Sequence, residues 1–148
     1  NKIKYIAERV NWIHSVEKAK YLKEIDKRAG QAQRVISALI QVNISDEKQK
    51  GGCKPEALAG ILESAKAYKH VKVKGLMGMA TFADDAEDVR PEFKLLKQLF
   101  DDHQKYNGGS VQLQHLSMGM TNDMEIAIQE GATMVRIGSA IFGERNYD

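Results

Sequence analysis

Short apolar segments alternate with amphipathic helical segments along almost all of this 148-residue chain. Pro55 and Pro91 each stand where a helix should begin, which suits the fixed backbone angle of proline. Repeated strand–helix units of this kind form parallel sheets with right-handed crossovers. The pattern therefore predicts an α/β fold with strands within residues 11–16, 34–45, 71–81, 111–117 and 133–138 and helices within 1–10, 17–30, 55–69, 91–106 and 121–131.

The arrangement of these elements favours a barrel. Each helix has one apolar stripe, so the helices should cover one face of the sheet, and the strands lack a clean polar alternation, so their other face should be apolar too. A doubly wound sheet would carry a glycine-rich first turn, and neither G-x-G-x-x-G nor G-x-x-x-x-G-K-S/T occurs. A complete (β/α)8 barrel has eight strands and typically about 250 residues. We therefore expect a TIM-barrel type fold, present as a partial barrel of about five parallel strands with two open edges.

Composition excludes several classes of function. The 22 basic and 20 acidic residues nearly cancel, which argues against a nucleic-acid partner. No apolar run approaches the length of about 20 residues that a membrane span needs, so we expect no membrane partner. The single cysteine, Cys53, cannot form an internal disulfide and indicates a reducing, cytoplasmic compartment. The chain opens on Asn1 rather than methionine, as an internal fragment or a processed product would.

Two segments rich in Gly, Ser and Thr follow the last two predicted strands, "SMGMTND" at 117–123 and "RIGSAIFG" at 136–143. In (β/α)8 barrels the loops after the last two strands often hold a phosphate. Gly119 lets the backbone approach an anion closely, while Gly138 and Ser139 offer amides and a hydroxyl. The two segments together predict a phosphate site.

The helix after the first of these segments should contribute to that site. Thr121 or Asn122 is expected to cap it, leaving free amides that favour negative charge. Asp123 and Glu125 fall in its first turn, where they complement the helix dipole but would repel a phosphate that they faced. We expect both carboxylates to face away from the site.

Arg136 lies within the last predicted strand, so its side chain points to the opposite face from its two apolar neighbours. A guanidinium that points into a barrel needs a partner. A salt bridge to a carboxylate and a contact to a ligand are both consistent with this position.

The remaining candidates have ordinary structural explanations. His14 stands at a strand end and could lie at the barrel mouth, but such a residue, like His115, is more often a structural hydrogen-bonding group. The acidic stretch at 83–88 lacks EF-hand spacing and is interpreted as a solvated loop. Most of the methionines are expected in the core. No zinc-ligand cluster and no Ser-His-Asp arrangement with usable spacing occurs, so no metal and no catalytic residue is predicted.

The stretch "LSMGMTNDMEIAIQEGATMVRIGSAIFGER" at 116–145 closely resembles the pyridoxal-phosphate homeostasis proteins, which are single-domain relatives of the N-terminal barrel of alanine racemase. "NKIKYI", "IHSV", "LIQVNISDEKQKGG" and "VKGLMGM" resemble segments after the third barrel strand and at the fourth, fifth and sixth strands. The resemblance covers essentially the whole chain. It implies a barrel that binds pyridoxal 5'-phosphate (PLP), with no established catalytic activity, that buffers or delivers this cofactor in vitamin B6 homeostasis.

The resemblance also implies roles for individual residues. Met118, Gly119 and Thr121 would surround the phosphate, together with Gly138 and Ser139; Thr121 stands where the family usually has serine, and the hydroxyl is kept.

Arg136, by the same resemblance, would face the pyridine nitrogen. An arginine there keeps that nitrogen unprotonated and the ring a weaker electron sink, which suits a carrier better than an enzyme.

The lysine that forms the Schiff base in this family lies on the first barrel strand, and the first three strands would precede Asn1. Lys72 and Lys74 stand at the start of their strand, the wrong end. Lys18, Lys48 and Lys50 lie in charged helix-start or loop sequence. We therefore expect residues 1–148 to be the C-terminal portion of a single PLP-binding barrel domain, with the phosphate half of the site and without the covalent half.

Two alternatives remain open. One is a racemase- or decarboxylase-like PLP enzyme, which would need an added acid–base residue and a second domain over the barrel mouth. The other is a fragment that functions only by self-association or by pairing with the missing strands.

Overall fold

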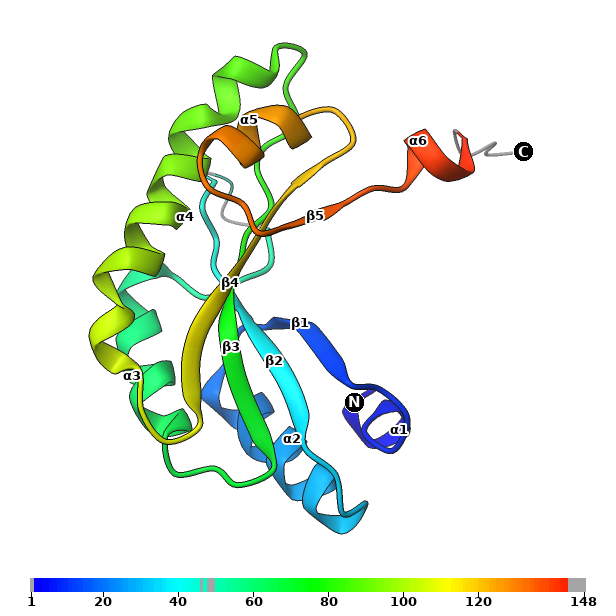
Figure 1. Cartoon of the computed structure of the whole chain (residues 1–148), viewed down its shortest axis with the longest axis vertical. Helices are drawn as coiled ribbons and strands as arrows, with labels where there is room; N and C mark the ends of the chain where they lie inside the picture. Colours follow the sequence, from blue (N-terminus) through cyan, green and yellow to red (C-terminus); the bar gives the residue numbers. More distant parts are fainter. Residues whose placement is uncertain (1, 46, 48–49, 144–148) are drawn as a thin grey trace.

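A single parallel sheet forms the frame of the chain. The computed structural model describes residues 2–45, 47 and 50–143. Five strands lie in the order β1-β2-β3-β4-β5, each parallel to the next (Figure 1). They span Trp12–Val16, Ile36–Gln41, Val71–Met77, Val111–Met120 and Met134–Arg136. The predicted α/β fold with five parallel strands is confirmed, and the carboxyl ends of all five strands meet at one edge.

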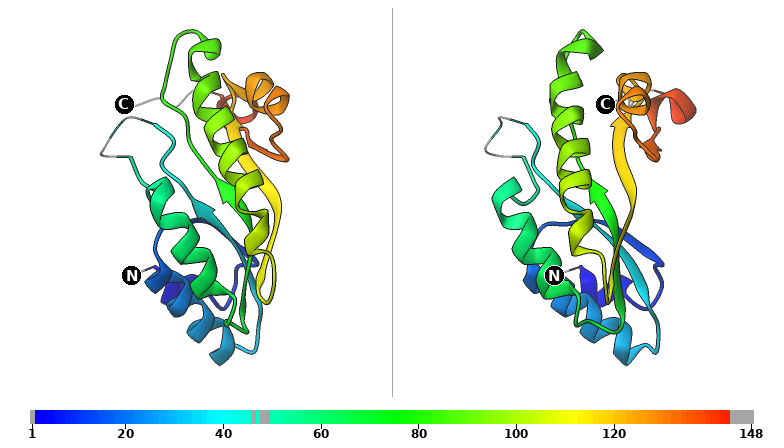
Figure 2. Two further views of the ribbon diagram at one scale, coloured as in Figure 1. Left: turned by 90° about the vertical axis from the view of Figure 1, so that its left-hand side faces the viewer. Right: turned by 60° about the vertical axis from the view of Figure 1, so that its left-hand side comes forward.

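Helices connect these strands, as parallel pairing requires. The α-helices are α1 (Ile3–Ile6), α2 (Ala19–Gln31), α3 (Pro55–Ala65), α4 (Arg90–Asp102), α5 (Met124–Gln129) and α6 (Ser139–Phe142), with 3-10 turns η1 (Ala86–Val89) and η2 (Gln104–Tyr106). Figures 1 and 2 show α2, α3 and α4 along one face of the sheet. No helix in the described part of the chain is long and apolar enough to cross a bilayer.

The hydrophobic core lies between this face of the sheet and the three long helices. Each helix contributes side chains one turn apart, such as Leu22 and Ile25 on α2 or Phe93 and Leu96 on α4, all 0% exposed. The strands contribute alternate residues to the same layer, as Ile36, Ala38 and Ile40 do on β2, and the alternation shifts by one residue within β3 and β4. The fully buried aliphatic residues of the strands include Ile36, Ile40, Leu76 and Leu116.

The sheet curls so strongly that β1 approaches β4 across the opposite, concave face. The ring centroid of Trp12 on β1 lies 5.3 Å from that of His115 on β4. In the sheet, β2 and β3 lie between these two strands. A flat sheet would hold these strands roughly 14 Å apart, since neighbouring strands lie about 4.8 Å apart. The five strands therefore form half of a barrel.

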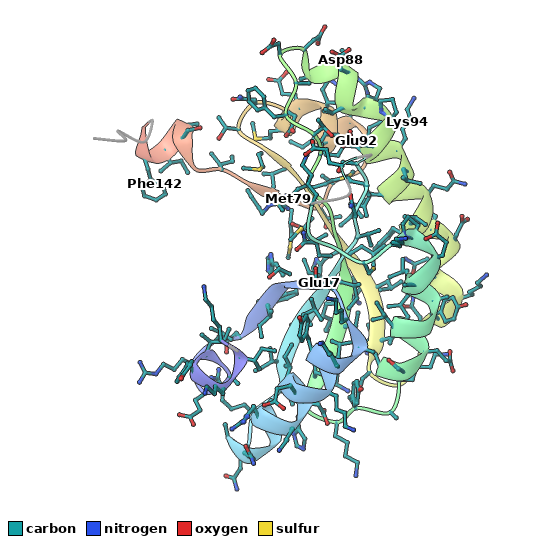
Figure 3. All side chains as sticks on the ribbon, turned by 180° about the vertical axis from the view of Figure 1, so that it is seen from behind. Glu17, Met79, Asp88, Glu92, Lys94 and Phe142 are labelled. Carbon is teal, nitrogen blue, oxygen red and sulfur yellow. The ribbon has the colours of Figure 1, made fainter. Side chains whose placement is uncertain are left out.

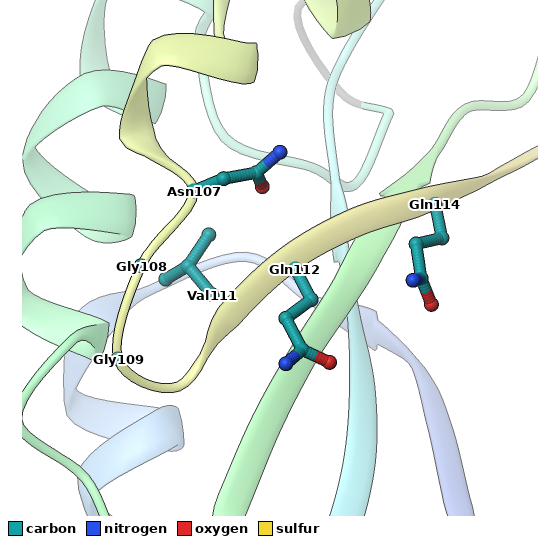
Figure 4. A pocket seen from close by; sticks show the side chains of 6 residues that line it. All are labelled: Asn107, Gly108, Gly109, Val111, Gln112 and Gln114. Carbon is teal, nitrogen blue, oxygen red and sulfur yellow. The ribbon is translucent and has the colours of Figure 1, made fainter.

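The expectation of an apolar concave face is wrong in the amino-terminal halves of the strands. Lys72 and Lys74 on β3 alternate with core residues, and their amines donate to the side chains of Ser110 and Gln112. Gln112 and Gln114 project from β4 in Figure 4, where they border a hollow of about 440 Å³ at the amino end of the strand. This hollow lies at the opposite end of β4 from the segments predicted to hold a phosphate.

Element boundaries also differ from the predicted ones. β4 continues to Met120, three residues past its predicted end, because Met120 still pairs with Arg136 of β5. Half of the segment predicted as a phosphate loop is therefore strand. β5 is shorter than its predicted range of 133–138 and ends at Arg136. The first helix is also shorter than predicted and covers only Ile3–Ile6.

Candidate functional site

A groove of about 950 Å³ lies at the carboxyl ends of β3, β4 and β5. Its walls are the segments that follow these strands, at residues 80–82, 120–123 and 138–143. Thr121, Gly138 and Ser139, which the sequence assigned to one phosphate site, all line this groove. The tertiary structure thus brings together two segments that are 15 residues or more apart in the chain.

Met118 and Gly119 shape the wall behind the groove. Met118 is 0% exposed and packs in the helix-facing core, so its side chain does not reach the groove. Gly119 has a φ of +92°, and a Cβ atom there would lie 2.5 Å from the Cβ of Ala127 on α5. Only glycine allows the end of β4 to pass this close to α5.

The prediction that Thr121 or Asn122 caps α5 is wrong. Asp123, rather than Thr121 or Asn122, is the residue at the amino end of the helix, and it makes no side-chain cap to α5. Its carboxylate instead accepts the backbone amide of Met120 at 2.6 Å, and Met120 O accepts the amide of Asp123 at 3.2 Å. Short acidic side chains often close turns in this way. Asp123 therefore lines the groove, contrary to the expectation that it faces away.

Arg136 points to the concave side and holds the ends of three strands together. Its Nη1 donates to Ser117 Oγ at 2.8 Å, and its Nη2 donates to Gly78 O at 3.0 Å. Across the described ranges it forms no ion pair, so the salt-bridge interpretation finds no partner there. Burial lowers the pKa of Arg136, and the negative charge of Asp123 acts in the opposite direction. The structure thus leaves Arg136 as a partly buried cation held by neutral acceptors.

Both histidines considered in the sequence lie on the concave face beside this arginine. Trp12 contacts His14 and His115 edge-to-face, with ring centroids 5.7 and 5.3 Å apart. Burial is the main cause that lowers the pKa of His14, followed by the positive charges of Arg136 and His115. His14 is therefore predominantly neutral at pH 7.

The segment after β3 is the wall of the groove that sequence reasoning missed. Its residues Ala80, Thr81 and Phe82 line the groove, whereas the sequence suggested only a strand end followed by a solvated acidic loop. The signal was present, because this strand also ends in glycine and a hydroxyl residue, Gly78 and Thr81. The interpretation of the acidic residues themselves is confirmed, since Asp84, Asp85, Glu87 and Asp88 are exposed.

Arg90 connects this wall to the neighbouring one. Its guanidinium contacts Glu87 of η1 at 2.7 Å and Glu130 at the end of α5 at 2.5 Å. These contacts raise the pKa of Arg90 further above its ordinary range. The ion pairs thereby link the start of α4 to α5, which follows the groove residues 120–123.

No lysine or cysteine is among the described residues that line the groove. Lys18 and Lys50 pair with Glu17 and Glu47 at 3.5 and 2.9 Å, and Lys48 lies outside the described residues. Burial raises the pKa of the Cys53 thiol to about 11, so this thiol stays protonated at neutral pH. In the described ranges no group of three or more His, Cys, Asp or Glu side chains could hold a metal ion.

Parallel strands, outer helices and a groove at the strand carboxyl ends define a domain of the (β/α)8-barrel class. The model of the alanine racemase N-terminal domain matches residues 1–146, and the chain belongs to this family. The expected fold class is thereby confirmed.

The curated relatives indicate one branch of that family. The chain is 47% identical to the pyridoxal phosphate homeostasis protein of Aquifex aeolicus, covering 99% of this chain and 64% of that protein. It is 35% identical to the protein of the same name from Haemophilus influenzae, covering 99% of this chain and 62% of that one. The resemblance found in the sequence is confirmed. The chain spans a little under two thirds of the length of these relatives.

Solved structures of other proteins share the fold of this chain. PipY of Synechococcus elongatus without PLP superposes with a TM-score of 0.88 at 30% identity, covering 97% of this chain and 66% of that chain. PipY with PLP bound gives a TM-score of 0.84 at 28% identity, with the same coverage. An alanine racemase from Clostridium difficile, at 13% identity and a TM-score of 0.71, covers 93% of this chain and 37% of that chain and shares the fold.

Replacing Gly119 by alanine should destabilise the protein. The added methyl group must adopt a positive φ and overlaps Ala127, so we expect the free energy of unfolding to fall by about 2–4 kcal/mol. Urea denaturation of the Gly119→Ala protein measures this loss. Gly60 on α3 has open space around its Cβ position and serves as the control, since Gly60→Ala should not destabilise the protein. Equal stability of wild type and Gly119→Ala would contradict the requirement for glycine at this position.

Protonation of His14 should make the protein less stable in acid. Because its pKa is lowered in the folded state from the ordinary value of 6.5, the unfolded chain takes up the proton first as the pH falls. Stability from this group is complete above pH 6.5 and is lost as the pH falls through the folded-state pKa. Unfolding experiments from pH 8 to 5 should show a shallower decline for His14→Gln than for wild type. Identical pH profiles would rule out this role.

Proposed function

We propose that this chain binds PLP through its phosphate in the groove, as part of a non-catalytic PLP carrier or buffer of the vitamin B6 homeostasis type. The observation that carries the proposal is the convergence of Thr121, Gly138 and Ser139 on one groove at the ends of β4 and β5. Loops after the last two strands hold phosphate in barrels of this class. The names of the similar proteins and the PLP-bound structure of PipY support the same ligand.

The residues present fit a phosphate monoester. Hydroxyl and amide groups donate hydrogen bonds to phosphate oxygens without the desolvation that a buried ion pair requires. Among the described residues no lysine or arginine lines the groove, and the carboxylate of Asp123 opposes an anion. That carboxylate is already held by the amide of Met120, and the nearby charge of Arg136 partly offsets it.

Arg136 would face the pyridine ring from the concave side. Bound PLP supplies an aldehyde on an electron-withdrawing ring. The bonds of Arg136 to Ser117 and Gly78 fix its guanidinium as a permanent donor, because arginine does not release its proton at neutral pH. A donor of this kind leaves the pyridine nitrogen without a proton, which suits storage of the cofactor.

The part of the groove lining that the structure describes contains no lysine that could attach to the aldehyde. We infer that this chain holds PLP reversibly and carries out no catalysis by itself. It would do so in the cytoplasm, where a single free cysteine is compatible with the reducing environment.

Calorimetric titration of the chain tests the ligand. We expect saturable binding of PLP, weaker binding of inorganic phosphate and no comparable binding of pyridoxal, which lacks the phosphate. After borohydride reduction, intact-mass measurement should show no PLP attached to a lysine. Thr121→Val should weaken PLP binding about tenfold, since it removes one hydrogen bond to a charged group. Failure of the wild-type chain to bind PLP, or a lysine adduct, would refute the proposal.

We further propose that the half-barrel pairs with a polypeptide that completes the barrel, either the missing amino-terminal strands or a second copy. Among the described strands, β1 pairs only with β2 and β5 only with β4. Unpaired edges of this kind readily accept another strand. The concave face also carries Lys72, Lys74 and Arg136, cations that a covering segment could neutralise.

Sedimentation velocity over a range of concentrations tests this pairing. The chain should associate with itself, or with an added fragment corresponding to the first third of a relative. The association should persist at moderate salt because backbone hydrogen bonds and apolar contacts would dominate it. A monodisperse monomer that ignores the fragment would exclude both forms of pairing.

A further inference from the structure

Thr81 lies in the same groove as Thr121 and Ser139, on the wall formed by the segment after β3. The three residues come from the segments that follow three neighbouring parallel strands, and all three line this groove. We propose that Thr81 is a third hydroxyl donor to the phosphate, and that the site selects a phosphate monoester by one hydroxyl from each of three strands. This inference rests on the proposed function of the groove.

The three groove hydroxyls differ from several others in the fold. Ser117, Ser110 and Thr133 each use their hydroxyl in a bond to the protein, with Arg136, Tyr68 O and the Leu116 amide respectively. Within the described part of the chain, the hydroxyls of Thr81, Thr121 and Ser139 make no such bond. Among the described residues, they are the hydroxyls of the groove lining.

The backbone that leads to Thr81 is fixed at its start. Gly78 donates its amide to Ser117 O at 3.0 Å and accepts Nη2 of Arg136 at the same distance. The end of β3 is therefore tied to both β4 and β5. Such fixed geometry reduces the entropy that a ligand must remove on binding.

Two further bonds fix the rest of the segment. Lys50 Nζ donates to Ala80 O at 3.2 Å, and Glu92 Oε2 on α4 accepts the amide of Thr81 at 2.8 Å. Figure 3 shows Glu92 on α4 and Met79 at the start of this segment. Because Glu92 occupies the amide of Thr81, the hydroxyl is the donor that Thr81 has left for a ligand.

The number of donors explains a preference for phosphate. A phosphate monoester presents three terminal oxygens, whereas a carboxylate presents two. Since no lysine or arginine is among the described residues that line the groove, affinity should depend on how many oxygens meet a donor. Three hydroxyls can each meet a different terminal oxygen of a phosphate, whereas a carboxylate offers only two oxygens for them to share.

Thr81→Val tests the hydroxyl while keeping the shape of the side chain and the amide bond to Glu92. In calorimetric titrations of the full chain, Thr81→Val should bind PLP and inorganic phosphate about tenfold more weakly than wild type. Thr81→Ser, which keeps the hydroxyl, should stay within about twofold of wild type. Ser15→Ala is the matched control, since Ser15 is an exposed hydroxyl residue on β1, outside the groove.

The results of these titrations decide between the proposed function and the proposed role of Thr81. If Thr81→Val binds PLP like wild type while Thr121→Val is weakened, Thr81 is not a ligand and the proposed function stands. If Thr81→Val weakens pyridoxal as much as PLP, the hydroxyl does not act on the phosphate and the inference is wrong. If the wild-type chain binds neither PLP nor phosphate, both proposals fall. Thermal unfolding of each variant shows whether it is folded, and Thr81→Ala replaces Thr81→Val if valine disrupts the loop.

Discussion

The hydrogen bonds of Arg136 hold the candidate site together. β5 is only three residues long, and its backbone pairing with β4 is correspondingly brief. The guanidinium adds one bond to Ser117 on β4 and one to Gly78 at the end of β3. One side chain thereby connects the ends of the three strands whose following segments form the groove. The position of each groove wall depends on this contact.

The electrostatics of the site follow from the same residue. Arg136 is a partly buried cation without an ion pair among the described residues, and it lies beside a neutral His14 and within the field of Asp123. Among the described residues, the groove is lined by hydroxyl and amide groups, apolar side chains and the carboxylate of Asp123. Under the proposed function, such a site would bind an anion by hydrogen-bond geometry more than by charge, and release would require no strong ion pair to break.

Sequence reasoning predicted the strand order, the outer helices and two of the three groove walls. These features depend on local patterns, namely apolar periodicity, proline at helix starts and glycine next to hydroxyl residues. It was wrong about the cap of α5 and the direction of Asp123, because a side-chain bond to the Met120 amide competes with helix capping at that position. It missed Thr81 because that residue follows a strand that is not one of the last two and precedes an acidic loop.

The sequence by itself determined the alternation of strands and helices, the family and the residues able to bind a phosphate, since all of these are encoded in the order of residue types. The tertiary structure determined which of these residues lie close together. Curling of the sheet brought Trp12 onto His115, the parallel strand order placed Thr81 and Thr121 in one groove, and burial in the helix-facing core kept Met118 out of the groove. These are contacts between distant parts of the chain, and they depend on sheet twist and packing, which no local pattern specifies.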